Sequence, residues 1–367
     1  MTTALLLLIL VAALAYWNGA NDVSKGIATL AGSGVANLKT AVIWGTLCTV
    51  AGALTAAVLA GKLVKAFSGS GLITDMPVGH GFLLAVAIGS MVWVAIATLT
   101  RLPVSTTHSI TGALVGAGVA VGGWNGLNWD RLLDKFLIPL AVSPLLALAL
   151  MYFLFPLFSF GFARLQNYCL CLEKTGWSLS GQSAAAMTQE ATEMVAGKST
   201  DCECEPAVTH RLNILDALHW LSSGAVSFAR GLNDAPKILG VGLAASLTLN
   251  LDSGTALFIV ALAMGLGSAF AGFKVTETLA TKVTPMSPVQ GFSANLVTAF
   301  LVIIASRMGV PVSTTHVSSS AIIGMGLKRD AKSVNWNTVR DMLLAWLVTL
   351  PIAAIIAATV VSYFPGN

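Results

Sequence analysis

Charged residues are scarce in this sequence of 367 residues: Asp, Glu, Lys and Arg together make up 10%, whereas hydrophobic residues make up 56%. A soluble domain carries roughly 25% charged residues, because its surface faces water. The mean hydropathy is +0.81. This composition excludes an ordinary soluble globular protein and indicates a chain embedded in a lipid bilayer.

Cysteine and histidine are also rare, with five residues of each. The Cys-x-Cys pairs at 169–171 and 202–204 lack the spacing of a standard zinc site, and we interpret them as loop cysteines. A nucleophile with an adjacent base is not apparent, since Thr107 and His108 are neighbours that would not face one another on a helix. We therefore expect no enzyme.

The net charge is +4, and the Lys and Arg residues are scattered over short loops. This pattern is typical of a membrane protein, in which basic loops set the orientation in the bilayer, rather than of a protein that binds nucleic acid.

Apolar runs of membrane-spanning length recur along the chain. A helix needs about 20 apolar residues to cross the hydrocarbon core, and the runs predict about 10–12 transmembrane or re-entrant helices. The first run, at 3–31, lacks a basic leading region and continues into a repeated motif, so we expect it to be retained rather than cleaved. The predicted fold class is an all-α polytopic membrane protein.

Motifs occur twice in the same order. GANDVSK at 19–25 matches GLNDAPK at 231–237, an offset of 212 residues, and PVSTTH at 103–108 recurs unchanged at 311–316, an offset of 208. An Asn-Trp pair follows each copy of PVSTTH. The chain is therefore a duplicated unit.

The duplication divides the chain into a first membrane repeat at 1–160 and a second at 210–367. Residues 161–209 between them are acidic and polar, and we predict a hydrophilic linker with a short helix near 184–195. If 3–31 forms one crossing, five crossings separate corresponding motifs. Because five is an odd number, the second repeat is inverted in the membrane relative to the first. Inverted repeats with broken helices and a binding site where they meet are typical of secondary transporters.

Each repeat carries an Asn-Asp pair deep in an apolar run: Asn21, Asp22, Asn233 and Asp234. The preceding Gly19 and Gly231 predict helix breaks that free backbone carbonyls. Carboxylate, amide and carbonyl oxygens suit a sodium ion, and the same oxygens could instead hold a proton. Lys25 and Lys237 follow three residues after each Asp, so a purely structural Asp–Lys bridge is the alternative.

The PVSTTH segments supply hydroxyl donors in both repeats: Ser105, Thr106, Thr107, Ser313, Thr314 and Thr315. Proline is favoured in the first turn of a helix and Ser or Thr at its cap, so each segment predicts a helix start. Free amides and the helix dipole then favour an anion. The alternative is that Ser and Thr only cap their own backbone. We expect His108 and His316 to orient a neighbour, with proton carriage or anion donation as alternatives.

The segments GANDVSKGIATLAGSG and GLNDAPK, with both copies of PVSTTH, resemble the inorganic phosphate transporter (PiT) family over both apolar halves. The resemblance implies a plasma-membrane symporter of phosphate with sodium or protons, with an inverted repeat and commonly oligomeric. It places cations at Asn21, Asp22, Asn233 and Asp234, and phosphate at the six hydroxyl residues of the PVSTTH segments. This chain departs from the common family pattern at Ser24-Lys25, where relatives often have Ala-Asn.

We therefore predict symport of inorganic phosphate with sodium by alternating access. A proton-coupled phosphate permease and a sulphate permease are the alternatives, because some members of this family carry sulphate. We expect sodium as the coupling ion, no organic cofactor, and a homodimer or another homo-oligomer in the bilayer.

Overall fold

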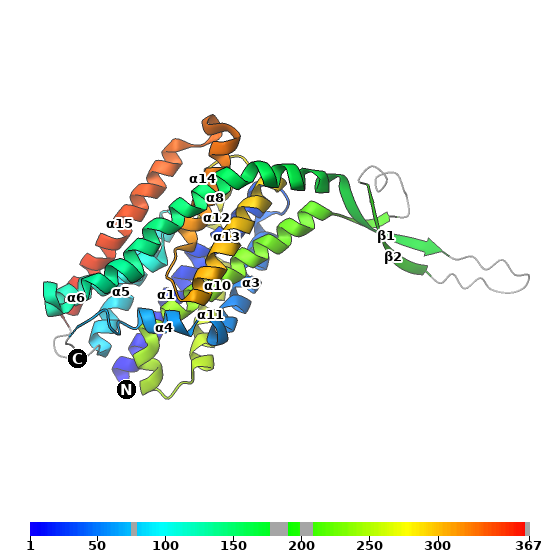
Figure 1. Ribbon diagram of the computed structural model, residues 1–367. Helices are drawn as coiled ribbons and strands as arrows, with labels where there is room; N and C mark the ends of the chain where they lie inside the picture. Colours follow the sequence, from blue (N-terminus) through cyan, green and yellow to red (C-terminus); the bar gives the residue numbers. More distant parts are fainter. Residues whose placement is uncertain (75–78, 177–189, 199–207, 364–367) are drawn as a thin grey trace, which may run out of the picture.

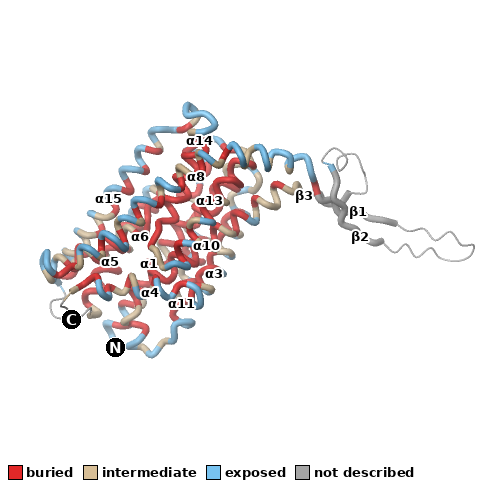
Figure 2. The backbone as a smooth tube through the Cα atoms, in the orientation of Figure 1, coloured by how far each residue is buried: buried red, intermediate tan, exposed pale blue. Residues whose placement is uncertain are grey.

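The computed structural model describes residues 1–74, 79–176, 190–198 and 208–363. The helices form one bundle, and a small β-sheet projects from one end of it (Figure 1). Met1 and the end of the last helix lie at the opposite end (Figure 1). Buried residues concentrate in the middle of the bundle and exposed residues on its outside (Figure 2).

The long helices of the two halves follow the same order, although the first half is divided into more elements. The first half consists of α1 (Thr2–Asp22), α2 (Ser24–Gly32), α3 (Leu38–Leu59), α4 (Gly61–Phe67), α5 (His80–Leu99), α6 (Thr106–Gly122), η1 (Trp124–Gly126), α7 (Trp129–Leu132), η2 (Leu133–Leu137), α8 (Ile138–Ala163) and η3 (Arg164–Asn167). The second half consists of α10 (Ile214–Thr248), α11 (Ser253–Ala271), α12 (Phe273–Thr281), α13 (Pro288–Met308), α14 (Thr314–Asp330), η4 (Ala331–Ser333) and α15 (Trp336–Val361). The duplication seen in the sequence therefore extends to the order of helices.

Seven helical stretches among the described residues are long and apolar enough to cross a bilayer. They comprise α1–α2, α3, α5, the stretch from α7 to η3, α11, α13 and α15. The helices α6, α10 and α14 carry three of the four polar motifs and complete five long segments in each half. Large apolar side chains such as Leu54, Phe153 and Phe270 are exposed on the outside, as expected for a surface that meets lipid.

Interrupted helices occur at the same place in both halves. Helices α3 and α4 meet at Ala60, whose φ and ψ of −128° and 23° leave the helical region. Helices α11 and α12 meet at Gly272. These interruptions lie one element later than the Asn-Asp motifs, where the breaks were predicted, and Gly272 itself keeps helical φ and ψ of −74° and −11°.

The first helix of each half packs against the second helix of the other half: α1 against α11, and α10 against α3. Glycines permit this close approach. A Cβ added at Gly19 would lie 2.0 Å from the Met264 carbonyl oxygen, and one at Gly231 would lie 2.1 Å from that of Thr49. The exchange of partners brings the Asn-Asp pairs of both halves into one interior.

These glycines do not break their helices as predicted. Helix α10 is continuous across Gly231, so the expected break there is wrong. In the first half the interruption is the single residue Val23, whose φ and ψ of −56° and −31° remain helical. The Asn21 carbonyl beside it accepts hydrogen bonds from Ser24 Oγ and Lys25 Nζ, both at 2.8 Å. Close packing therefore explains the glycines, although one carbonyl is available to side chains.

The insert between the halves contains β1 (Tyr168–Gly176), β2 (Glu190–Lys198) and β3 (Val208–Asn213), an antiparallel sheet in the order β2-β1-β3. The predicted helix near 184–195 is wrong for 190–195, which lie in β2, and 184–189 lie outside the described residues. Cys169 lies in β1 and is disulfide-bonded, rather than being a loop cysteine. The all-α class therefore holds for the bundle but not for the insert, and the repeat boundaries at 160 and 210 stay a prediction.

Candidate functional site

The two helices that follow the PVSTTH segments begin as predicted. Helices α6 and α14 start one residue after Ser105 and Ser313. Each serine caps its own helix: Ser105 Oγ accepts from the His108 amide at 3.1 Å, and Ser313 Oγ accepts from the His316 amide at 3.2 Å. The capping interpretation therefore holds for the serines, whose hydroxyls satisfy one first-turn amide each.

The two helix starts contact one another reciprocally. Thr107 Oγ1 donates to the Val312 carbonyl at 3.3 Å, and Thr315 Oγ1 donates to the Val104 carbonyl at 2.7 Å. Thr107 corresponds to Thr315 and Val104 to Val312 at the offset of 208 residues, so the two contacts are equivalent in the two halves. From this meeting point α6 runs toward the end of the bundle near Met1, whereas α14 runs toward the other end (Figure 1).

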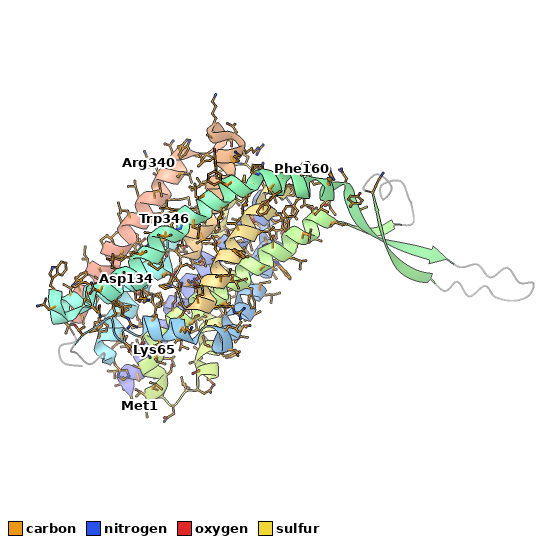
Figure 3. The ribbon with its side chains drawn as sticks, viewed as in Figure 1. Met1, Lys65, Asp134, Phe160, Arg340 and Trp346 are labelled. Atoms are coloured by element: carbon orange, nitrogen blue, oxygen red, sulfur yellow. The ribbon has the colours of Figure 1, made fainter. Side chains whose placement is uncertain are left out.

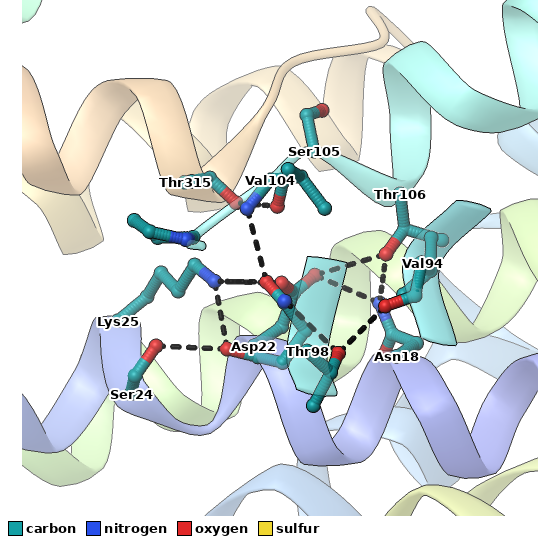
Figure 4. A network of polar contacts seen from close by, with 12 residues as sticks. Asn18, Asp22, Ser24, Lys25, Val94, Thr98, Val104, Ser105, Thr106 and Thr315 are labelled. Atoms are coloured by element: carbon teal, nitrogen blue, oxygen red, sulfur yellow. Dashed lines mark hydrogen bonds and ion pairs between the residues drawn. The ribbon is translucent and has the colours of Figure 1, made fainter. Parts of the chain in front are cut away.

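In the first half, oxygen atoms surround the ammonium group of Lys25 (Figure 4). Its Nζ lies 2.8 Å from each of three atoms: Asn21 O, Asn21 Oδ1 and Asp22 Oδ1. The Asn21 amide is oriented by α5, because its Nδ2 donates to Thr98 Oγ1 at 3.0 Å. All three residues of the motif are buried, so the ion pair is shielded from water.

A single amide joins the carboxylates of the two halves. Asn18 Nδ2 lies 2.8 Å from Asp22 Oδ2, 3.3 Å from Asp234 Oδ2 and 3.0 Å from Thr106 Oγ1. Thr106 Oγ1 in turn donates to Asp22 Oδ2 at 3.3 Å. A hydroxyl of the α6 start and the Asn-Asp pair therefore belong to one network (Figure 4).

In the second half, Lys237 is placed differently. Its Nζ lies 2.7 Å from Thr107 Oγ1 and 2.7 Å from the Val312 carbonyl, whereas Asp234 Oδ1 lies at 3.5 Å. Asn233 Nδ2 donates to Asp234 Oδ1 at 2.9 Å and to the Val312 carbonyl at 3.2 Å. Lys237 therefore bridges the two helix starts.

Sequence reasoning missed two residues of this network, Asn18 and Arg230. The Arg230 guanidinium is fully buried, and its Nη1 donates to Thr49 Oγ1 at 3.2 Å while its Nε lies 3.9 Å from Asp234 Oδ2. Two signals could have found it. An arginine inside an apolar helical run is rare and usually functional, and Arg230 follows Asn18 at the offset of 212 that relates the Asn-Asp motifs.

The two histidines face each other between the helix starts. The ring centroids of His108 and His316 are 4.3 Å apart. His108 Nδ1 lies 3.0 Å from Ser105 Oγ, which is the orienting contact that we expected. His316 stacks on Trp346 at 4.0 Å, and its buried Nε2 has no hydrogen-bond partner among the described residues.

The structure thus brings the predicted cation and phosphate residues into one region. These residues are at most 4% exposed, apart from His108, which is partly buried. They are Asn21, Asp22, Lys25, Ser105, Thr106, Thr107, His108, Asn233, Asp234, Lys237, Ser313, Thr314, Thr315 and His316. Their convergence is the geometry that a shared site requires.

A basic pocket of about 410 Å³ lies beside this region. Its charged lining consists of Lys62, Lys65, Arg131, Asp134 and Lys135 (Figure 3 labels Lys65 and Asp134). Pro311, just before α14, and Phe136 also line it. Phe136 packs edge-to-face on Phe67 at 5.2 Å, and the Phe67 ring centroid lies 5.9 Å from Lys237 Nζ. The two packed rings therefore connect the lining of the pocket with Lys237.

Known proteins resemble this chain over nearly its full length. A relative from Bacillus subtilis, described as a probable low-affinity inorganic phosphate transporter, is 30% identical over 99% of this chain and 97% of its own. One of the same description from Mycobacterium bovis is 27% identical over 96% and 76%. A solved structure, described as the sodium-dependent phosphate transporter, matches with a TM-score of 0.77 at 24% identity over 99% of both chains, which shows the fold.

The helical bundle and the seven apolar spans among the described residues indicate a multi-pass membrane protein, and the Bacillus subtilis relative agrees on a transporter rather than an enzyme. The model of the phosphate transporter family matches residues 18–357, which include both Asn-Asp pairs and both PVSTTH segments. The chain belongs to the phosphate transporter family.

Proposed function

We propose that this protein carries inorganic phosphate across the plasma membrane by alternating access, in symport with sodium. The observation that carries the proposal is the meeting of α6 and α14 at their N-terminal ends, with Thr107 and Thr315 in reciprocal contact. Backbone amides at a helix N-terminus and the helix dipole favour an anion. Two such starts that face one another provide donors from opposite sides of a tetrahedral oxyanion.

The charge of the region also favours an anion. Among the described residues, the buried side chains that carry formal charge are two carboxylates, Asp22 and Asp234, and three cations, Lys25, Arg230 and Lys237. One positive charge is therefore in excess inside the membrane part of the protein, where an uncompensated charge is costly. A phosphate anion that binds between the helix starts supplies the missing negative charge.

Sodium is the proposed coupling ion because the Asn-Asp pairs offer oxygens that suit it. Asn21, Asp22, Asn233 and Asp234 together supply amide and carboxylate oxygens, and the Asn21 carbonyl is accessible to side chains. The structurally similar protein is described as a sodium-dependent phosphate transporter, which supports the same ion. Protons as coupling ions and sulphate as the anion are the alternatives that an uptake experiment must separate.

The burial of the site and the duplication support alternating access. The residues proposed to bind phosphate are at most 3% exposed, so binding and release require the halves to move. Counterpart helices α6 and α14 run in opposite directions from their meeting point (Figure 1). This is the relation that an inverted repeat needs in order to open the same site to either side in turn. We also propose a homo-oligomer, on the resemblance to the family.

Uptake of radiolabelled phosphate into proteoliposomes tests the function. We expect an inward sodium gradient to drive accumulation, and excess arsenate to compete more strongly than sulphate. Accumulation that follows an imposed pH gradient and ignores sodium would establish proton coupling instead. Stronger competition by sulphate would establish a sulphate permease. Phosphate equilibration without accumulation under either gradient would contradict symport and indicate a passive channel.

A further inference from the structure

The two lysines of the duplicated motif occupy equivalent positions in the sequence but make different contacts. Lys25 and Lys237 are related by the offset of 212 residues, and each follows its Asp by three residues. Both are buried, with 0% and 1% of their surface exposed. The two ammonium groups nevertheless lie against different partners.

Lys25 stays inside its own repeat. A backbone carbonyl, an amide oxygen and a carboxylate oxygen surround Nζ at one distance, 2.8 Å. All three oxygens come from Asn21 and Asp22, the pair expected to hold a cation. The ammonium group supplies the single positive charge that a bound sodium ion would supply, so the first oxygen site already contains a cation that is tethered to the chain.

Lys237 contacts a residue of the other repeat. Its two shortest contacts, at 2.7 Å, are Thr107 of the α6 start and the Val312 carbonyl ahead of α14. Its own Asp234 is the more distant partner at 3.5 Å. This ammonium group therefore lies at the junction of the two helix N-termini, where the proposed phosphate would receive its other donors.

We infer that the two lysines have separate roles, with Lys25 a tethered cation in the first oxygen site and Lys237 a phosphate-binding residue. The inference rests on the proposed phosphate transport and refines its ion coupling. The sodium ion proposed above then belongs to the second pair, Asn233 and Asp234. A single sodium ion and the one excess positive charge of the buried side chains together balance a doubly charged phosphate.

Sodium-dependent stability of purified protein tests the role of Lys25 without any transport. In Lys25→Asn the tethered charge is removed and Asp22 loses its counter-ion, so sodium should bind in its place. We expect the melting temperature of this variant in detergent to rise by at least about 2 °C with NaCl, compared with N-methylglucamine chloride at the same concentration. Wild type and Lys39→Gln, which loses an exposed lysine, should show a smaller rise.

An equal sodium response in Lys25→Asn and wild type would overturn the assignment of Lys25. If Lys25→Asn cannot be purified, Lys25→Met provides the second readout, because its apolar side chain removes the charge and keeps the volume. Excess sodium in the growth and extraction buffers should then raise the yield of folded Lys25→Met. A yield that is the same in sodium and N-methylglucamine buffers would again contradict the assignment.

Phosphate affinity tests the role of Lys237. A hydrogen bond to a charged group corresponds to about a tenfold change in affinity or more, so Lys237→Gln should raise the KM for phosphate at least about tenfold at saturating sodium. The sodium concentration for half-maximal uptake should change much less, and Lys237→Arg should recover part of the phosphate affinity. An unchanged phosphate KM in Lys237→Gln, or an equal loss of sodium affinity, would overturn this assignment.

Failure of wild-type protein to take up phosphate would instead refute the proposed function, and would leave the sodium response of Lys25→Asn interpretable.

Discussion

Arg230 Nη2 donates a hydrogen bond to Asn18 Oδ1 at 3.3 Å, and these two residues are each other's counterparts in the duplicated unit. The duplication therefore loses its symmetry at the centre, where one half contributes a cation and the other a neutral amide. Asn18 uses its Nδ2 to join Asp22 and Asp234. Arg230 thus fixes the amide that connects the two carboxylates.

Replacement of this arginine should destabilise the protein and stop transport. In Arg230→Gln, Asp234 loses a buried cationic partner, and such losses cost about 3–5 kcal/mol of folding free energy. We expect a lower melting temperature in detergent and no phosphate uptake. The exposed Arg340→Gln removes the same group from the bundle surface, where its side chain is 66% exposed, and should leave both quantities unchanged. A stable, active Arg230→Gln would show that the central amide needs no cation.

Asp22→Asn should abolish phosphate uptake. The substitution keeps the size of the side chain but removes the charge that pairs with Lys25 at 2.8 Å, and so leaves a buried ammonium group without its carboxylate. Initial rates of radiolabelled phosphate uptake provide the measurement. Asp341→Asn is the matched control, because that carboxylate is 53% exposed and pairs with its neighbour Arg340. Near-normal uptake by Asp22→Asn would show that transport does not depend on the Asp22–Lys25 pair.

The threonines at the helix starts should differ from the serines before them. Thr107→Val replaces a hydroxyl by a methyl group at nearly constant volume, and we expect it to raise the phosphate KM about tenfold, as loss of one hydrogen bond to an anion does. Thr107→Ser keeps the hydroxyl and should be close to wild type. Ser105→Ala should instead lower stability by about 1 kcal/mol, because Ser105 caps α6. A melting temperature that falls in Thr107→Val as far as it does in Ser105→Ala would indicate a structural role for Thr107 as well.

Local sequence patterns were sufficient for some features of the site. A serine that caps its own helix marks a helix start through local backbone chemistry, and both starts were predicted correctly. Pro103 and Pro311, however, lie two residues before the capping serines rather than in the first turn. The shared offset of the motifs predicted that Asp22 and Asp234 belong to equivalent places. Their approach to a single Asn18 amide follows from that duplication and from the packing of α1 and α10 in one interior.

Features that depend on packing were not predictable in the same way. Glycine permits both a helix break and a close helix contact, and the neighbouring carbonyls of Met264 and Thr49 determine that Gly19 and Gly231 serve the second purpose. The different positions of Lys25 and Lys237 depend on Thr107, which comes from the other half of the chain. Pairing of β1 with β2 likewise joins segments whose polar composition indicated only a linker.

Gly116 in α6 should not tolerate a side chain. A Cβ added at Gly116 would lie 2.0 Å from the Ala354 carbonyl oxygen of α15, and backbone cannot move aside as a flexible side chain can. Gly116→Ala should therefore destabilise the protein by about 1–3 kcal/mol, the usual cost of overpacking. Gly161→Ala in α8 is the control, since an added Cβ there meets nothing within 4 Å and alanine favours a helix. Melting temperatures that fall equally in both variants would show that α6 and α15 are not in close contact.

The basic pocket should speed the capture of phosphate without taking part in the central site. Positive charge in a cleft raises the local concentration of an anion, and salt screens this attraction beyond about 10 Å at 0.1 M. Lys62→Gln with Lys65→Gln should therefore reduce uptake about threefold or more at low phosphate and low ionic strength, with an unchanged maximal rate. Added choline chloride at constant sodium should remove the difference from wild type. A loss that persists at high ionic strength, or a loss equal to that of the exposed Lys39→Gln, would show that the pocket does not attract the substrate.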